Sequence, residues 1–142
     1  MNEHIKDAIE SANTHEHQGF LDIESCAMIL SNVCFGMSAR AGWWTDIKTG
    51  EPLERNIPEM LCLIHSEISE GLEGHRKDLM DDKLPHRKML EVELADAAIR
   101  IFDMAGGLQL DVAGAIAEKL KFNANRSDHK IENRLKKGGK KI

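Results

Sequence analysis

The chain has 142 residues, of which 42% are hydrophobic and 30% are charged. This length suits one domain with a single core, and the composition excludes both a disordered chain and a membrane protein. The longest apolar stretches are far shorter than the roughly 20 residues that cross a bilayer, and the sequence starts without the basic segment and apolar run of a signal peptide. We therefore expect a single cytoplasmic domain over residues 1–142.

The net charge of −5 is unevenly distributed along the chain. Between residues 130 and 142, six cations stand against a single acid, Glu132. This basic tail, about 127–142, lacks an apolar period and contains Gly138-Gly139, which predicts a mobile arm. It could contact nucleic acid or the polyanionic substrate of its own site, but the acidic body makes nucleic acid an unlikely partner.

Residues 1–20 are polar and form either a short helix or a frayed arm. The first firm helix is expected over about 22–40, where apolar residues recur at helical spacing, and Gly42 ends it. The following segment to Pro52 is expected to be a loop, because it combines glycine, proline and polar turn formers. The cysteines lack C-x-x-C spacing, and each has apolar neighbours in the sequence. We therefore expect reduced thiols buried in the core: Cys26, Cys34 and Cys62.

Three more helices follow from capping and breaking signals. Asn56 is a good N-cap, with Pro58 in the first turn and Glu59 in the capping-box position, and this helix is expected to run to about residue 79. The next helix is expected over about 86–105, ended by Gly106-Gly107, and the last over about 111–125. Four amphipathic helices with short connections predict an all-α fold, an antiparallel helical bundle.

Two pairs of acids stand out on these helices. Glu67 and Glu70 are three residues apart on one predicted helix, and Glu93 and Asp96 repeat the spacing on the next. Residues with this spacing share one helix face, so antiparallel neighbours can bring the two pairs together. Either pair alone is typical of a solvated helix face, but both interrupt apolar segments, which favours a cleft or a buried site.

Four converging carboxylates repel one another and need cations to neutralise them. An all-oxygen site suits Mg²⁺, with Mn²⁺ as a possible substitute, whereas zinc normally takes Cys and His ligands. On the last helix, Lys119, Asn123 and Arg126 follow the spacing i, i+4, i+7, which predicts a stripe that can clamp a polyphosphate. Basic residues at a helix end are also expected from the helix dipole alone.

Three aromatic side chains are candidates for contact with a nucleobase. Trp43 and Trp44 either anchor the loop to the core or stack on a base. His65, beside the first acidic pair, is either a contact of the site or an ordinary helix residue.

The order Glu67-x-x-Glu70, a gap of 22 residues, Glu93-x-x-Asp96, then Lys119, Asn123 and Arg126 resembles the MazG-like branch of the all-α nucleoside triphosphate pyrophosphatase superfamily. The resemblance covers about residues 59–126, and the terminal Gly138-Gly139-Lys140-Lys141 is similar to small bacterial and phage members. It implies a homodimer or homotetramer that binds Mg²⁺ through the four acids and hydrolyses NTPs or dNTPs between the α- and β-phosphates. Either Glu67 or Glu70 would then act on the attacking water.

The resemblance also implies roles outside the acidic pairs. Lys119 and Arg126 would offset charge on the departing pyrophosphate. Lys140 and Lys141 would be further phosphate contacts, and Trp43 or Trp44 would hold the base. The chain carries one such module without a second domain, unlike the longer members of the family.

Two other classes of protein compete with this interpretation. A di-iron carboxylate bundle would need Glu-x-x-His motifs, and no Glu in the chain has His three residues later. A non-enzymatic helical dimer would use the basic tail to contact a partner, with its acids on the surface. It predicts thermal stability that is independent of Mg²⁺ and salt-sensitive binding through residues 130–142.

Overall fold

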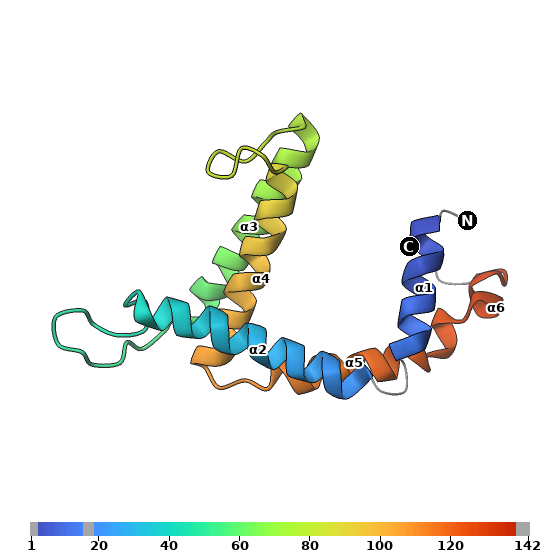
Figure 1. The fold of residues 1–142 in the computed structure, drawn as a ribbon, viewed down its shortest axis with the longest axis horizontal. Coiled ribbons are helices and arrows are strands. Elements are labelled where there is room, and N and C mark those ends of the chain that lie inside the picture. The colour runs from blue at the N-terminus through green and yellow to red at the C-terminus, as the bar shows by residue number, and fades with distance from the viewer. Residues whose placement is uncertain (1–2, 16–18, 139–142) are drawn as a thin grey trace. The chain divides into compact units, whose positions relative to one another are not determined.

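The computed structural model describes residues 3–15 and 19–138, and helices are the main regular elements of this part of the chain (Figure 1). Its elements are α1 (Glu3–His15), α2 (Gly19–Arg40), α3 (Ile57–Lys77), α4 (Met89–Gly107), α5 (Val112–Ala124), the 3-10 turn η1 (Ser127–His129) and α6 (Ile131–Arg134). Within those ranges no strand forms, and the isolated β-bridges join Thr45 to Pro52 and Met80 to Lys88. The all-α prediction is confirmed.

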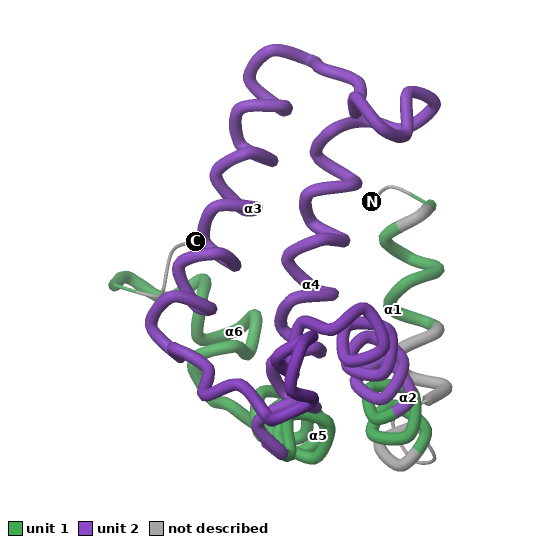
Figure 2. The backbone as a smooth tube through the Cα atoms, turned by 90° about the vertical axis from the view of Figure 1, so that its left-hand side faces the viewer, with its two compact units in different colours: residues 1–28, 111–142 green, residues 29–110 purple. Residues whose placement is uncertain are grey.

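The chain divides into two compact units (Figure 2). Unit 1 comprises residues 1–28 and 111–142, and unit 2 comprises residues 29–110. The boundary falls inside α2, so α3, α4 and the loop before them belong to unit 2, whereas α5 and α6 belong to unit 1. No helix in the described ranges combines the length and the apolar content needed to cross a membrane.

The predicted N-cap, Asn56, sets the start of α3, and a second side-chain cap sets the start of α5. The Asn56 side chain accepts a hydrogen bond from the backbone N–H of Glu59 at 3.3 Å, which satisfies one of the free donors at the start of α3. Asp111 caps α5 in the same way through Gly114, at 2.8 Å. Helix α2 ends at Arg40, and Gly42 follows with φ of 85°, a backbone conformation that favours glycine.

The expected role of Gly106-Gly107 as a helix stop is wrong, because α4 continues through both residues. A Cβ atom on Gly106 would lie 2.5 Å from the Cβ of Phe35, and one on Gly107 would overlap the Trp44 ring. The two glycines therefore allow close packing against side chains from α2 and the loop that follows it. The helix stops only afterwards, with Gln109 at φ of 55°.

Helices α3 and α4 lie side by side and run antiparallel (Figures 1 and 2). The loop that joins them is held by its own polar groups: buried Asp81 accepts hydrogen bonds from the backbone N–H groups of Lys83 and Leu84 at 3.0 and 2.6 Å. Lys88 pairs with Asp78 at 2.6 Å across the base of the loop. These contacts fix the register of the two helices, and so decide which side chains meet between them.

Helix α3 buries only part of the apolar stripe that its helical spacing marks, Met60, Leu61, Ile64, Ile68 and Leu72. Its buried residues are Met60, Glu67, Gly71 and Gly74. Leu61, Ile68 and Leu72 are instead exposed by 47, 48 and 58%. The physical reason is the two glycines, since a helix face without side chains lets a neighbouring helix approach closely.

Replacing Gly74 with alanine tests this close approach. An alanine Cβ would lie 2.8 Å from the Cβ of Met89, so α4 must shift, and we expect a net loss of about 1–2 kcal/mol in the free energy of unfolding despite the better helix propensity of alanine. The control is Gly36→Ala on α2, where nothing lies within 4 Å. That variant should gain about 0.5–1 kcal/mol. Equal effects of the two substitutions in urea denaturation would contradict the packing.

The three cysteines are free, as expected, but their predicted burial is wrong for two of them. Cys26 and Cys62 are exposed, and Cys34 is partly buried.

Candidate metal centre

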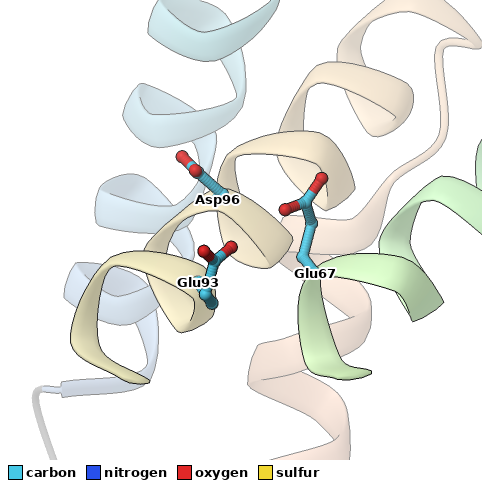
Figure 3. A group of neighbouring side chains, drawn as sticks. All are labelled: Glu67, Glu93 and Asp96. Atoms are coloured by element: carbon cyan, nitrogen blue, oxygen red, sulfur yellow. The ribbon is translucent and has the colours of Figure 1, made fainter. Parts of the chain in front are cut away.

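The contact face between α3 and α4 carries a group of three carboxylates (Figure 3). Glu67 comes from the middle of α3, and Glu93 and Asp96 come from α4. One carboxylate oxygen from each lies within 4.8 Å of the others. Two features bring these acids together. The connecting loop sets the register of the helices, and Gly71 has no side chain to hold α4 away from α3.

The cluster is largely shielded from water. Glu67 and Glu93 are each only 7% exposed, whereas Asp96 is not buried. Acidic residues at such positions are rarely left unpaired, because burial penalises the charged form. Two buried acids side by side therefore call for a cation or a proton.

The surroundings of Glu93 raise the pKa of its carboxyl group. Its pKa is raised from the ordinary 4.5 to about 7, first by burial, then by a hydrogen bond to Glu67, and then by the charges of Glu70, Glu67 and Asp96. Glu93 therefore keeps its proton to a higher pH than an ordinary Glu does, and its hydrogen bond with Glu67 favours this protonated form. Desolvation combined with like charges is the pattern found at functional sites.

Glu70, the fourth predicted acid, is placed differently from the other three. It is exposed on α3 and lies outside the group whose oxygens approach within 4.8 Å. It is still close enough for its charge to raise the pKa of Glu93. The structure therefore brings three of the predicted acids together and leaves Glu70 at the solvent side of the cluster.

Arg100 is a member of the site that the sequence analysis missed. Its Nε donates a hydrogen bond to Oε1 of Glu67 across the two helices, at 2.6 Å. The available signal was its position, four residues after Asp96 and seven after Glu93 on the same helix face.

The donor set fits a hard divalent cation. It consists of carboxylate oxygens, the ligands that Mg²⁺ and Mn²⁺ prefer, without the Cys or His that zinc would take. The raised pKa of Glu93 accords with such a site, because burial and the neighbouring carboxylates both disfavour a further negative charge there. Glu67, Glu93 and Asp96 could hold such an ion, and the charge of Glu70 acts on the same cluster.

Comparisons with known proteins add nothing to this geometry. The chain matches no protein-family model, no curated protein and no solved structure. The resemblance to the MazG-like class therefore remains a prediction, and the chemistry of the acidic cluster is the ground for proposing a function.

The predicted phosphate stripe differs from its expected form. Lys119 and Asn123 lie on α5, but the helix ends at Ala124, and Arg126 has an extended backbone beyond it. The expectation of one helical stripe is thus wrong for Arg126. Both cations instead lie over the ring of Phe122: the Lys119 Nζ and the Arg126 guanidinium carbon are 4.8 and 6.0 Å from its centroid.

Arg126 is also held by a neighbouring acid. Its Nε and Nη2 donate to the two oxygens of Asp128 at 2.9 and 2.6 Å, which lowers the pKa of Asp128 to about 2. Asn123 has a buried side-chain oxygen without a hydrogen-bond partner in the described residues. The other two predicted phosphate contacts, Lys140 and Lys141, lie outside the described residues.

The two tryptophans have different surroundings in the structure. Trp44 packs edge-to-face against Phe35 with ring centroids 5.5 Å apart, and its Nε1 donates to Asp103 at 2.8 Å. The Arg55 guanidinium carbon lies 5.2 Å from the centroid of the same ring. Trp44 is therefore an anchor between the loop and α4, whereas Trp43 is 65% exposed and His65 is also exposed.

Replacing each tryptophan with phenylalanine tests this assignment. Trp44→Phe removes the hydrogen bond to Asp103, so we expect a loss of about 1.5–3 kcal/mol in the free energy of unfolding, typical for a bond to a charged group. Trp43→Phe should change stability by no more than about 0.5 kcal/mol, as at most surface positions. Thermal unfolding of both variants measures the difference, and a larger loss for Trp43→Phe would reverse the assignment.

Proposed function

We propose that the protein is a Mg²⁺-dependent nucleoside triphosphate pyrophosphohydrolase of the MazG-like class, located in the cytoplasm. The observation that carries the proposal is the meeting of Glu67, Glu93 and Asp96 from two helices, with oxygens within 4.8 Å of one another. A buried acidic cluster that attracts a hard divalent cation is suited to polyphosphate chemistry, since such ions keep several waters and accept phosphate oxygens as ligands. The order of the motifs along the chain supports the same class.

The acidic residues would have two roles in this reaction. Glu67, Glu93 and Asp96 would hold the cation, which supplies Lewis-acid charge and a water of lowered pKa. Glu67 or Glu70 would orient that water and accept its proton. Glu70 is the more accessible of these two carboxylates, so it can exchange a proton with solvent more readily.

The remaining candidate contacts bind the substrate. Lys119, Asn123 and Arg126 would bind phosphate oxygens, with Lys140 and Lys141 as further candidates. Arg126 would have to exchange Asp128 for the substrate, because its guanidinium is already paired. Trp43 is the tryptophan we propose for the base, since the ring of Trp44 is occupied by Phe35, Asp103 and Arg55.

We also propose that a second copy of the chain covers the outer face of α3 and α4. Large apolar side chains at helical spacing are exposed there by 40–58%: Leu61, Ile68, Leu72, Leu94 and Ile101. Large apolar side chains that recur on exposed helix faces are typical of an interface. Light scattering should give a mass of two or four chains, and the mass of one chain would contradict the assembly.

The enzymatic proposal is tested by incubating the protein with each of the common NTPs and dNTPs and Mg²⁺, followed by an assay for pyrophosphate. Phosphoribosyl-ATP belongs in the panel as an alternative substrate of the same fold class. Pyrophosphate release from at least one compound is expected, and no turnover of any of them would contradict the proposal. The panel also identifies the preferred base and sugar.

The exposed basic residues before the C-terminus favour a second candidate, the non-enzymatic interaction module. Lys130, Arg134, Lys136 and Lys137 are all exposed, and so are Ile131 and Leu135, by 75 and 81%. This function predicts salt-sensitive binding of nucleic acid that is lost on removal of residues 130–142, together with melting temperatures that do not respond to Mg²⁺. A Mg²⁺-dependent melting temperature would argue against it.

A further inference from the structure

Arg100 occupies a position for which the proposed reaction gives no role. It lies one helical turn after Asp96 on α4, so its side chain starts from the same face as the metal-binding acids. From there its Nε reaches across to Oε1 of Glu67 on α3, at 2.6 Å. The guanidinium is thus the positive charge in direct contact with the cluster.

The two partners of this ion pair differ sharply in their exposure. The Glu67 side chain is 9% exposed, whereas the Arg100 side chain is 44% exposed. Water therefore screens little of the charge at Glu67, but the arginine has solvent on one side into which it can withdraw. Arginine has a high pKa and keeps its charge at any physiological pH, so it leaves the carboxylate only by moving.

A divalent cation in the cluster would need the same carboxylate. Its ligand oxygens, one each from Glu67, Glu93 and Asp96, all lie within 4.8 Å of one another. An ion bound among them would share the Glu67 carboxylate with the guanidinium, and two positive charges at one carboxylate repel each other. The arginine and the metal ion therefore compete for Glu67.

We propose that Arg100 is the resident counter-ion of Glu67 in the metal-free chain and that binding of a divalent cation displaces it. This inference rests on the proposed function, because it presupposes the metal centre. Arg100 is a positioning residue in this scheme: its hydrogen bond holds the Glu67 carboxylate in place between the helices until the ion arrives. The cost is a lower affinity for the ion, since the ion pair must first be broken.

Metal binding to the full chain without nucleotide tests the competition. Titration with Mn²⁺ by calorimetry should show that Arg100→Gln binds the ion about tenfold more tightly than the wild type, as expected for the loss of one charge-assisted hydrogen bond. The metal-free variant should melt at a lower temperature, and saturating Mn²⁺ should remove most of that difference. The control is Arg87→Gln, which removes an exposed arginine paired with Glu91 at 3.5 Å.

NMR of the arginine side chains provides a readout that does not depend on the stability of a variant. The Nε–H resonance of Arg100, assigned by its disappearance in Arg100→Lys, should move on titration with Mg²⁺ to the position of a solvent-exposed arginine. A resonance that stays in place at saturation, or a Mn²⁺ affinity that is unchanged or reduced in Arg100→Gln, would overturn the displacement.

The two proposals fail in different ways. A wild type that binds Mn²⁺ and releases pyrophosphate, with an Arg100→Gln variant of equal affinity, contradicts only the role of Arg100. If neither the wild type nor the variant binds Mn²⁺ at millimolar concentration, the metal centre fails, and the counter-ion scheme fails with it.

Discussion

Asp96→Asn should release pyrophosphate from the preferred nucleotide at least about 100-fold more slowly than the wild type, because even residues that only support metal ligands cost about 10–100-fold when they are replaced. Asn keeps the shape of Asp96 but removes a negative charge from the cluster. Since Asp96 is the member that is not buried, its replacement should disturb the packing between α3 and α4 least. The loss of rate is therefore expected without a loss of fold.

Glu91→Gln is the matched control for this experiment. Glu91 lies on α4 two residues before Glu93, but it is exposed and pairs with Arg87 at 3.5 Å. It should retain nearly full activity, since its carboxylate does not belong to the cluster. Undiminished turnover by both Asp96→Asn and Glu70→Gln would rule out the assigned site.

Glu93→Gln is expected to stabilise the metal-free chain at pH 8 while abolishing its response to metal. Gln keeps the shape of protonated Glu93 and can still donate a hydrogen bond to Glu67, but it carries no charge to desolvate. We expect the metal-free variant to melt higher than the wild type by on the order of 5 °C. With Mn²⁺ added, only the wild type should gain stability, so the difference between the two melting temperatures should narrow or change sign.

The pH dependence of this difference has a definite sign. The folded-state pKa of Glu93 is raised from 4.5 to about 7, so between these values the folded chain binds more protons than the unfolded chain. Stability then falls as pH rises through this window, with no further loss from this group above about pH 7. The wild type and Glu93→Gln should therefore have similar melting temperatures near pH 4.5 and diverge up to about pH 7.

Thermal unfolding of both proteins in a chelating buffer across this range measures the effect. The comparison between them removes the contributions of other acids, such as Asp78, whose pKa is lowered by its hydrogen bond with Lys88. A difference that is constant with pH, or that shrinks as pH rises, would show that Glu93 is not held protonated by its surroundings.

Local signals in the sequence were sufficient to place the main helices. The cap at Asn56, the glycine after α2 and the cap at Asp111 each act through backbone hydrogen bonds or dihedral angles within a few residues. Such interactions depend little on the rest of the fold. The acidic spacing on α3 and α4 is local in the same sense, which is why three of the four predicted acids meet.

The packing between the helices could not be predicted in the same way. A rule that buries apolar stripes chooses Leu61, Ile68 and Leu72, whereas the contact with α4 uses Gly71 and Gly74. Either face of α3 could form the contact with α4. Which face does so depends on how closely α4 can approach it. The outward apolar stripe is the surface on which the proposed second copy would pack.

Pairings across long sequence distances were also missed. The hydrogen bond of Trp44 to Asp103 spans 59 residues, and that of Arg100 to Glu67 spans 33. No periodicity connects such positions, because the first contact depends on how the loop after α2 packs on α4, and the second on the register of α3 and α4. An arginine that follows two acids on one helix face in an apolar segment is nevertheless a useful sign of a counter-ion.

The most direct test of the central proposal is the identity of the products. Phosphorus NMR of the preferred nucleotide with wild-type protein and Mg²⁺ should show a nucleoside monophosphate and pyrophosphate in equal amounts, with no reaction in the presence of a chelator and at most a trace with Asp96→Asn. A nucleoside diphosphate with inorganic phosphate, or turnover that persists without the metal ion, would contradict the account.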